Sequence, residues 1–405
     1  MSLKKSRCKK IILSGGGTGG SVTPLLAVAR ELLTEGVNLI KSVSLAEGVN
    51  LTEGTNLTEG FNEEKHDSEK NNWDFVFVGT KKGPEKKLVE EFNCLGQKIK
   101  FIAIPAGKFR RYFSWQNFID IFRIFYAFFV SLRLLKKEKP DLFFSAGGFV
   151  SVPLAWAAYF LRIPIIIHQQ DVRAGLANRL MAPLARLITV TFEKSLQDYG
   201  ARAVWTGNPS REAPKDPSVF LGIKRKFNLN PNKLLLVITG GGTGSRFINN
   251  LTYESIHKLS EVAQVVHLTG LRKDLEDTKK LLDLPADYQA FEFIANEDAF
   301  LLLGAADLVV SRCGLATLTE LCELKKPAIL IPMPDSHQEE NAAIFKNAEA
   351  AVVFNQADLN AENFTQTIIN LLQTENQRQK LSNNIARLMK KEATTVIASF
   401  IKEII

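Results

Sequence analysis

The stretch LVVSRCGLATLTELCELKKPAILIPMPDSHQEEN, residues 308–341, sets the pattern of the whole chain. Two short apolar runs, Leu308–Ser311 and Ala328–Pro332, lie about one helix apart, and a glycine turn follows the first of them. Short buried strands separated by a helical segment are typical of βαβ units in a parallel sheet. The sequence therefore predicts an α/β fold with polar residues at the carboxyl ends of strands, where such sheets bind ligands.

Three polar residues of this stretch are candidates for a ligand site. Glu320 lies two turns into the predicted helix, and a carboxylate is a suitable acceptor for the two hydroxyls of a ribose. Gln338 and Asn341 share a face on a helical first turn, and amides both donate and accept hydrogen bonds with a sugar. The alternative is that Glu320 is a solvated helix residue and that the two amides belong to an ordinary helix start.

Length and composition indicate a globular protein of two domains. A chain of 405 residues is too long for one ordinary hydrophobic core. The formal charge of +8 indicates an anionic partner, which can be nucleic acid, phospholipid or a phosphorylated substrate. The four cysteines have no metal-ligand spacing and indicate reduced thiols. We expect no signal peptide and no spanning helix, because the uncharged apolar runs are too short.

Two glycine-rich turns each lie between a strand-like and a helix-like segment. SGGGTGGS (14–21) follows the apolar run Lys10–Leu13, and GGGTGS (240–245) follows Lys233–Thr239. Backbone N–H groups at a helix start attract phosphate, since the helix dipole is positive there. The pattern is not the dinucleotide fingerprint GxGxxG, and tight packing is the plain alternative. Its repetition in both halves predicts two similar domains that bind an anion or diphosphate.

Domain boundaries follow from composition. The segment GNPSREAPKDP (207–217) is rich in proline and glycine and predicts a hinge. We predict a first domain over 1–206, a second over 218–390, and a terminal helix within 391–405 that packs back on the first domain. The near-repeats LTEGVN, LAEGVN, LTEGTN and LTEGFN predict a flexible insert at about 41–72 without catalytic role. Other apolar runs predict further strands at 74–79, 141–146, 163–168, 187–191, 204–206, 265–268 and 290–293.

An aromatic and basic segment, residues 107–140, predicts a helix with only a narrow polar seam. Asp120, Arg123 and Arg133 exclude a bilayer span. Aromatics between basic clusters predict docking on an anionic membrane surface, the alternative being a helix packed on two sides in the core. The predicted membrane-facing residues are Phe113, Trp115, Phe118, Phe122, Phe125, Arg110 and Arg111.

Taken together, several motifs resemble those of the MurG family. They are SGGGTGGSVTPLLAVA, GGFVSVP, HQQDVRAGLANRL, GNPSR, GGGTGSRFINN, SRCGLATLTEL and HQEENA, in the family's order. The resemblance implies a GT-B fold, in which two doubly wound Rossmann-like domains face each other across a cleft. It also implies an inverting, metal-independent hexosyltransferase of peptidoglycan synthesis. This enzyme moves GlcNAc from UDP-GlcNAc to the muramoyl 4-hydroxyl of lipid I and forms lipid II, with no cofactor beyond its substrates.

The resemblance also implies which residues bind each substrate. Glu320 would hold the ribose, Gln338 and Asn341 the GlcNAc, and Ile294 would pack beside the uracil. The implied donor-binding set is Arg211, Gly241, Gly242, Thr243, Gly244, Ser245, Ile294, Glu320, Gln338 and Asn341. The implied acceptor-binding set is Thr18, Gly19, Gly20, Ser21 and Asn178.

Two departures from the family's pattern concern the catalytic base. Ser21 stands where the family usually has a histidine, and HQQD stands where it has HEQN, so the carboxylate is missing at Gln169 and present at Asp171. A serine cannot act as a base at neutral pH without a partner. We expect Asp171 to supply or support the base with help from His168, which makes Asp171, His168 and Ser21 the candidate catalytic set. Phe149 stands where a tyrosine is common.

The implied partners are UDP-GlcNAc, lipid I, other cell-wall synthesis proteins and the anionic cytoplasmic face of the plasma membrane, where the protein would be peripheral. One alternative is a UDP-sugar-binding pseudo-enzyme that has lost its base and acts as a membrane scaffold. Another is a different GT-B enzyme, such as a UDP-GlcNAc 2-epimerase or a glycolipid glycosyltransferase. Nucleic-acid binding is disfavoured, because the aromatics are not interleaved with basic residues along a groove.

Overall fold

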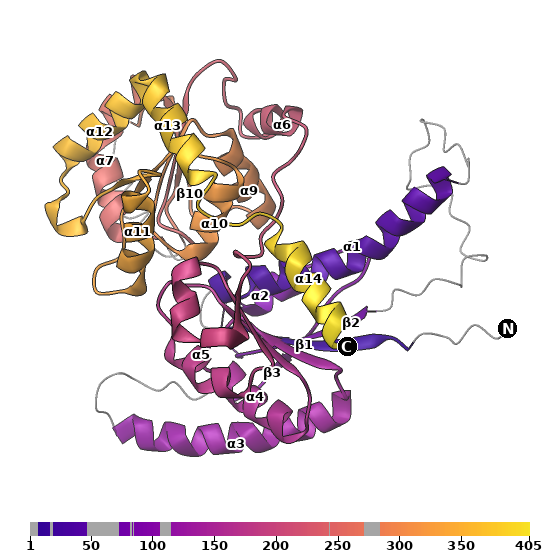
Figure 1. The fold of residues 1–405 in the computed structure, drawn as a ribbon. Coiled ribbons are helices and arrows are strands. Elements are labelled where there is room, and N and C mark those ends of the chain that lie inside the picture. Colours follow the sequence, from indigo (N-terminus) through magenta and orange to yellow (C-terminus); the bar gives the residue numbers. More distant parts are fainter. Residues whose placement is uncertain are drawn as a thin grey trace.

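The computed structural model describes residues 7–16, 19–46, 73–81, 83, 85–105, 115–242, 244–270 and 284–405. These residues form two α/β halves, each built on a parallel sheet (Figure 1). The strand orders are β3-β2-β1-β4-β5-β6-β7 and β10-β9-β8-β11-β12-β13. Both sheets are therefore doubly wound, with switch points between β1 and β4 and between β8 and β11. The α/β prediction is confirmed, and each glycine turn lies at a switch point, where such sheets bind ligands.

The first half has its sheet covered on both faces. Ile11 and Leu13 pack on the side of α1, whereas Ile12 packs on the side of α4, as the alternation of side chains along a strand requires. Its strands are β1 (Lys9–Ser14), β2 (Trp73–Gly79), β3 (Lys100–Ala103), β4 (Leu142–Ser145), β5 (Ile165–Gln169), β6 (Leu187–Val190) and β7 (Ala203–Trp205). Its α-helices are α1 (Thr23–Ala46), α2 (Glu85–Glu90), α3 (Trp115–Glu138), α4 (Ser151–Phe160) and α5 (Leu176–Met181).

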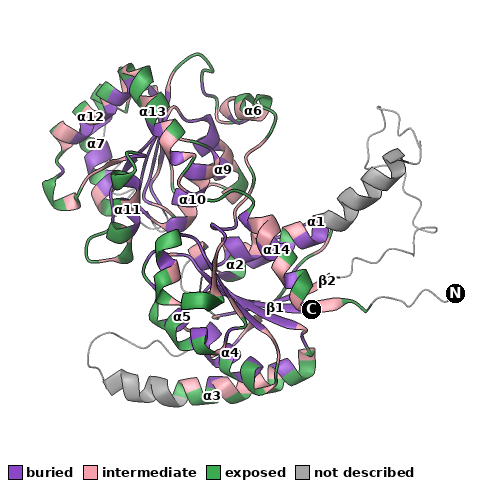
Figure 2. Ribbon diagram, viewed as in Figure 1, coloured by how far each residue is buried: buried purple, intermediate pink, exposed green. Residues whose placement is uncertain are grey.

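The second half repeats this arrangement. Val237 faces α9 and α10, whereas Leu236 and Ile238 face α7 and α12. Its strands are β8 (Leu235–Thr239), β9 (Gln264–Leu268), β10 (Tyr288–Phe291), β11 (Leu308–Ser311), β12 (Ala328–Leu330) and β13 (Val352–Val353). Its helices include α6 (Ser218–Lys226), α7 (Arg246–Ser260), α9 (Asn296–Ala305), α10 (Leu315–Glu323), α11 (His337–Asn347), α12 (Ala361–Gln373) and α13 (Glu375–Ile385). The central strands of both sheets are buried, and solvent-exposed residues lie mainly on the outer helices (Figure 2).

The last helix, α14 (Ala393–Ile404), crosses back to the first half and packs beside α1 (Figure 1). Ile397, Ala398 and Ile401 are buried in the core of the first half. Thr395 also donates a hydrogen bond from Oγ1 to Oε1 of Glu31 at 2.9 Å. The division of the chain at 206, 217 and 390 stays a prediction, with which the end of β7 and the start of α6 agree.

The structure differs from the sequence prediction in several places, among them the strand predicted at 290–293, which is β10 at Tyr288–Phe291. The edge strands β3 and β13 were not predicted, because they are short and only partly buried and thus lack a continuous apolar run. Strand β12 ends at Leu330 rather than Pro332. Helix α1 continues to Ala46, so the predicted insert begins as helix, and its remainder at 47–72 lies outside the described residues.

Candidate functional site

The second glycine turn connects β8 to α7. Gly241 and Gly244 have φ angles of +80° and +69°. A Cβ on Gly244 would lie 2.1 Å from the carbonyl oxygen of Thr269, so only glycine fits there. Ser245 caps α7 because its Oγ accepts a hydrogen bond from the backbone N–H of Ile248 at 3.4 Å. The turn thus presents the positive end of a 15-residue helix, which suits a phosphate.

Arg312 lies against this turn and was not singled out from the sequence. Its Nε donates to Oγ of Ser245 at 3.1 Å, and its Nη1 donates to the carbonyl oxygens of Ile331 and Pro332. Its Nη2 donates to Oε1 of Gln356 at 2.7 Å. These partners are neutral, and no carboxylate of the described residues pairs with it. Burial lowers the pKa of Arg312, but a guanidinium stays charged, so a half-buried cation lies beside the turn. The sequence feature that could have identified Arg312 is its position directly after a strand at a switch point.

Glu320 lies on α10, half-buried, and no described residue donates a hydrogen bond to its carboxylate. Desolvation raises the pKa of Glu320 to about 7, against the opposing charge of Arg211. The Arg211 guanidinium lies 5.8 Å from the ring centroid of Phe300. Ile294 packs against the apolar core of the same half. A desolvated carboxylate without donors is suited to accept the hydroxyl protons of a bound ligand.

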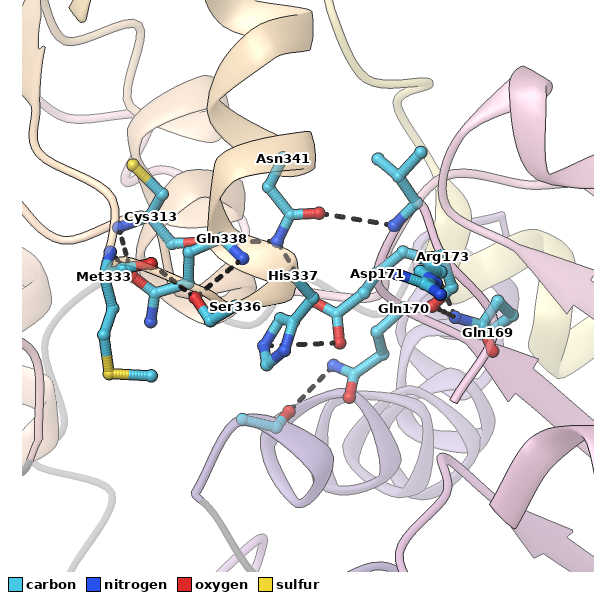
Figure 3. A network of polar contacts seen from close by, with 12 residues as sticks. Gln169, Gln170, Asp171, Arg173, Cys313, Met333, Ser336, His337, Gln338 and Asn341 are labelled. Atoms are coloured by element: carbon cyan, nitrogen blue, oxygen red, sulfur yellow. Dashed lines mark hydrogen bonds and ion pairs between the residues drawn. The ribbon is translucent and has the colours of Figure 1, made fainter. Parts of the chain in front are cut away.

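Gln338 and Asn341 both lie on α11, but their amides point to different places (Figure 3). Oε1 of Gln338 accepts from the backbone N–H groups of Cys313 and Met333, each at 3.1 Å. Its Nε2 has no partner among the described residues and is free to donate. Asn341 is 0% exposed, and its amide is used within the protein, as described below. The shared ligand-facing side inferred from their spacing is therefore corrected: in this conformation only Gln338 offers a free group.

The first glycine turn packs against the segment that follows β4. A Cβ on Gly148 would lie 2.7 Å from the carbonyl oxygen of Gly16. Nε2 of Gln170 donates to the carbonyl oxygen of Gly20 at 2.8 Å, and Ser21 is buried. Thr18 in this turn, and Thr243 in the second one, lie outside the described residues.

Asn178 lies on α5, next to the segment that follows β4, since a Cβ on Gly147 would lie 2.9 Å from its Oδ1. Its Nδ2 donates to Oε1 of Gln169 at 2.6 Å. Its Oδ1 is buried and has no partner among the residues that the structure describes. This oxygen is therefore available to a donor that the protein does not supply.

Substitution of Gly148 by alanine is expected to slow the transfer to an acceptor that the family resemblance implies by about tenfold or more, since backbone strain costs about 1–3 kcal/mol. The φ of +95° and the contact with Gly16 force the first glycine turn to move. The matched control is Gly175→Ala, where an added Cβ meets nothing within 4 Å. Initial rates over a range of acceptor concentrations measure the effect. Equal rates for both variants would contradict a role for this contact.

His168 does not fit the role predicted for it. Its ring is 0% exposed, with Nδ1 2.9 Å from Oγ1 of Thr189 and Nε2 2.8 Å from Oδ1 of Asn208. Burial lowers its pKa to about 4. Nδ2 of Asn208 donates in turn to Oγ1 of Thr319 at 2.7 Å, directly before Glu320 in the chain. His168 therefore links the two halves through Asn208 and has no face open to a substrate.

Asp171 lies where the two halves meet. Its Oδ1 accepts from Nδ2 of Asn341 at 3.0 Å, and its Oδ2 lies 3.8 Å from Nε2 of His337 (Figure 3). Nδ2 of Asn341 also donates to the carbonyl oxygen of Cys313 at 3.3 Å, and its Oδ1 accepts from the backbone N–H of Val172 at 3.3 Å. The imidazole that faces Asp171 is therefore His337 rather than His168. His337 was not singled out from the sequence, because it lies far from Asp171 along the chain.

Aromatic side chains are exposed on the outer side of the first half. Phe125 is 63% exposed, and Tyr126 and Phe129 on α3 are exposed to a similar degree. Trp156, Tyr159 and Phe160 are exposed on α4, which packs against α3. The side chains of Trp115, Phe118 and Phe122, and all of Arg110, Arg111 and Phe113, lie outside the described residues. No helix in the described part of the chain is long and apolar enough to cross a membrane.

Comparison with known proteins follows the same division into halves. Residues 65–190 match the glycosyltransferase family 28 N-terminal domain, and residues 235–398 match the glycosyltransferase family 28 C-terminal domain. A relative from Clostridium kluyveri is 35% identical over 356 residues, which cover 87% of this chain and 88% of the relative. It is named UDP-N-acetylglucosamine–N-acetylmuramyl-(pentapeptide) pyrophosphoryl-undecaprenol N-acetylglucosamine transferase. The chain belongs to the MurG family.

Other relatives agree with this membership. A transferase of the same name from Clostridium botulinum strain Kyoto is 32% identical and covers 95% of this chain and 99% of its own length. The crystal structure of MurG from Acinetobacter baumannii superposes with a TM-score of 0.65 at 22% identity, covering 98% of this chain and 99% of that one. UDP-GlcNAc 2-epimerase from Neisseria meningitidis superposes with a TM-score of 0.63 at 13% identity, covering 97% and 100%. These likenesses confirm the GT-B fold shared by MurG proteins.

Proposed function

We propose that this protein transfers GlcNAc from UDP-GlcNAc to the muramoyl 4-hydroxyl of lipid I, with inversion at the anomeric carbon, and thereby forms lipid II. The observation that carries the proposal is the group of Ser245, Arg312 and Glu320 at the switch point of the second sheet, in a chain of the MurG family. Together they provide a cation and a helix end for a diphosphate and a carboxylate for a ribose.

On the donor side, each part of UDP-GlcNAc has a matching group. The amides of the 240–245 turn, the α7 N-terminus and Arg312 bind the diphosphate and stabilise the departing UDP. Glu320 accepts from the ribose hydroxyls, with Arg211 beside it. Nε2 of Gln338 donates to the GlcNAc, and Ile294 packs beside the uracil.

On the acceptor side, the first glycine turn faces the diphosphate of lipid I. Backbone N–H groups of Gly19 and Gly20 lie at the start of the helical segment there, with Ser21 beside them. Oδ1 of Asn178 accepts a hydrogen bond from the acceptor substrate, which gives this buried oxygen the hydrogen-bond donor that it lacks among the described residues.

The test is transfer from labelled UDP-GlcNAc to a short-chain lipid I analogue in detergent. A β-linked disaccharide lipid is the expected product. Binding of UDP-GlcNAc without product would favour the scaffold interpretation, in which the base has been lost. An epimerised UDP-sugar, formed without acceptor, would favour the epimerase interpretation instead.

We also propose that the exposed aromatics of α3 and α4 hold the protein on the anionic cytoplasmic face of the plasma membrane. Phe125, Tyr126 and Phe129 lie within two turns of α3, and Tyr159 and Phe160 lie at the end of the adjacent α4. Exposed aromatic rings next to basic residues favour the membrane interface, and the net charge of +8 favours anionic lipid. The acceptor's polyprenyl chain lies in that membrane, so docking brings the first glycine turn to its substrate.

Replacing Phe125, Phe129 and Tyr159 by serine is expected to weaken binding to anionic vesicles by at least about a hundredfold, since burial of each aromatic ring contributes about 1–3 kcal/mol. Sedimentation with vesicles measures the partition. The matched control replaces Leu221 and Leu284, exposed apolar residues of the second half, by serine. Transfer to a water-soluble acceptor should be unchanged. Similar vesicle binding by both variants would refute this docking surface.

A further inference from the structure

The reaction proposed above needs a group that removes the proton of the acceptor hydroxyl, and histidine is the side chain suited to this near neutral pH. The chain has five histidines, of which His66 lies outside the described residues. His168 and His267 are 0% exposed, with both ring nitrogens in hydrogen bonds. His257 lies in the last turn of α7. Among the described histidines, only His337 is exposed where the two halves meet.

The position of His337 is determined by the start of α11. Ser336 caps this helix, since its Oγ accepts from the backbone N–H of Gln338 at 3.2 Å. His337 is the first helical residue, and its side chain is 49% exposed. Gln338, which follows it, is the donor-sugar ligand proposed above. The imidazole is thus accessible and adjacent to the donor site (Figure 3).

The other side of the imidazole faces the acceptor half. Nε2 of His337 lies 3.8 Å from Oδ2 of Asp171, while its Nδ1 has no hydrogen-bond partner among the described residues. Gln170, next to Asp171 in the chain, holds the carbonyl oxygen of Gly20 in the first glycine turn. The ring nitrogen that Asp171 does not face, Nδ1, is therefore left available to a substrate hydroxyl.

Asp171 is held in place from both halves. Its Oδ1 accepts from the fully buried Asn341, and its backbone carbonyl oxygen accepts from Nε2 of Gln169 at 2.7 Å. Other charged residues near His337 are Arg173 and Glu340, which pair with each other at 3.6 Å, and the exposed Asp335 and Glu339, which have no ion-pair partner among the described residues. Asp171 is therefore the carboxylate that faces the imidazole.

We propose that His337 is the general base of the transfer and that Asp171 is its positioning residue, an inference that rests on the proposed function. Nδ1 of His337 takes the proton of the acceptor hydroxyl as that oxygen forms a bond to C1 of GlcNAc. The bond between C1 and the β-phosphate oxygen breaks, and UDP leaves with the electron pair. Asp171 holds the tautomer with hydrogen on Nε2 and stabilises the imidazolium that forms. Their 3.8 Å separation is an ion-pair distance, and catalytic contacts commonly shorten when substrates bind.

The experiment measures kcat and KM of the full-length protein against pH, with UDP-GlcNAc and a soluble lipid I analogue. The wild-type rate is expected to fall on the acid side as an imidazole becomes protonated. His337→Gln should lower kcat by about 10²–10⁴-fold, flatten the acid limb and leave UDP affinity unchanged. Added imidazole should restore activity to His337→Ala in part. The matched control is His257→Gln, an exposed histidine remote from the substrates, which should behave as the wild type.

Asp171→Asn distinguishes the two roles. If Asp171 only positions the imidazole, Asp171→Asn should lower kcat, and the rate of this variant should still fall on the acid side of the pH profile as it does in the wild type. Transfer by His337→Gln within about tenfold of the wild type, with its acid limb intact, would overturn the proposal. Loss of that limb in Asp171→Asn alone would also overturn it and make Asp171 the base. A wild-type protein that binds UDP-GlcNAc but makes no product would refute the proposed function and, with it, the base.

Discussion

Replacing Arg312 by glutamine is expected to lower kcat/KM for transfer by about 10²–10³-fold, the usual cost of removing a donor that stabilises developing charge. The guanidinium lies beside Ser245 at the start of α7, half-buried and with only neutral partners. Its charge is therefore not cancelled by a carboxylate of the described residues and acts on the diphosphate. Because negative charge builds up on the diphosphate as UDP departs, kcat should fall more than the affinity for UDP-GlcNAc.

The measurement is steady-state kinetics with UDP binding by calorimetry alongside. Arg225→Gln on α6 removes the same charge from an exposed position and is the matched control. The Arg312 variant also leaves the carbonyl oxygens of Ile331 and Pro332 without their donor, so its free energy of unfolding should fall by about 1–3 kcal/mol. Arg312→Lys, which keeps the charge, should recover part of the activity. Wild-type kinetics in the folded glutamine variant would exclude Arg312 from the phosphate site.

Replacing Glu320 by glutamine is expected to have opposite effects on ligand affinity and on stability. Affinity for UDP should fall by about 10–100-fold, since hydrogen bonds to a charged group contribute about 1.5–3 kcal/mol. The free energy of unfolding at pH 8 should rise by about 2 kcal/mol, because the variant no longer desolvates a carboxylate. Calorimetric titration with UDP and urea denaturation without ligand measure the two effects.

The pH dependence of the free energy of unfolding identifies the cause of the higher stability expected for Glu320→Gln. Burial raises the pKa of Glu320 from its ordinary 4.5 to about 7. Between pH 4.5 and about 7, the folded protein therefore binds one more proton at this residue than the unfolded chain does. The resulting contribution to the free energy of unfolding is present below pH 4.5 and is lost as the pH rises through about 7. The decline should be absent in Glu320→Gln and retained in Glu254→Gln, an exposed glutamate on α7. A parallel decline in both variants would show that desolvation of Glu320 is not its source.

The sequence could predict most of the strands and both glycine turns, because each depends on neighbouring residues. Apolar runs such as Leu308–Ser311 form strands wherever helices cover both faces, and a glycine turn before a helix exposes the same N–H groups in any context. Edge strands such as Val352–Val353 lack that local signal, since one side of the strand faces solvent.

The tertiary structure decided the rest of the site. His168 and His337 each stand beside polar residues in the sequence, yet His168 is fully buried and His337 is exposed where the halves meet. The difference arises from burial, which depends on the whole fold. Asp171 and Asn341 are 170 residues apart, and only the packing of one half against the other joins them. The sequence by itself therefore determined the fold and the family. The tertiary structure decided which histidine can reach a substrate, because access to solvent and contacts between domains are not properties of local sequence.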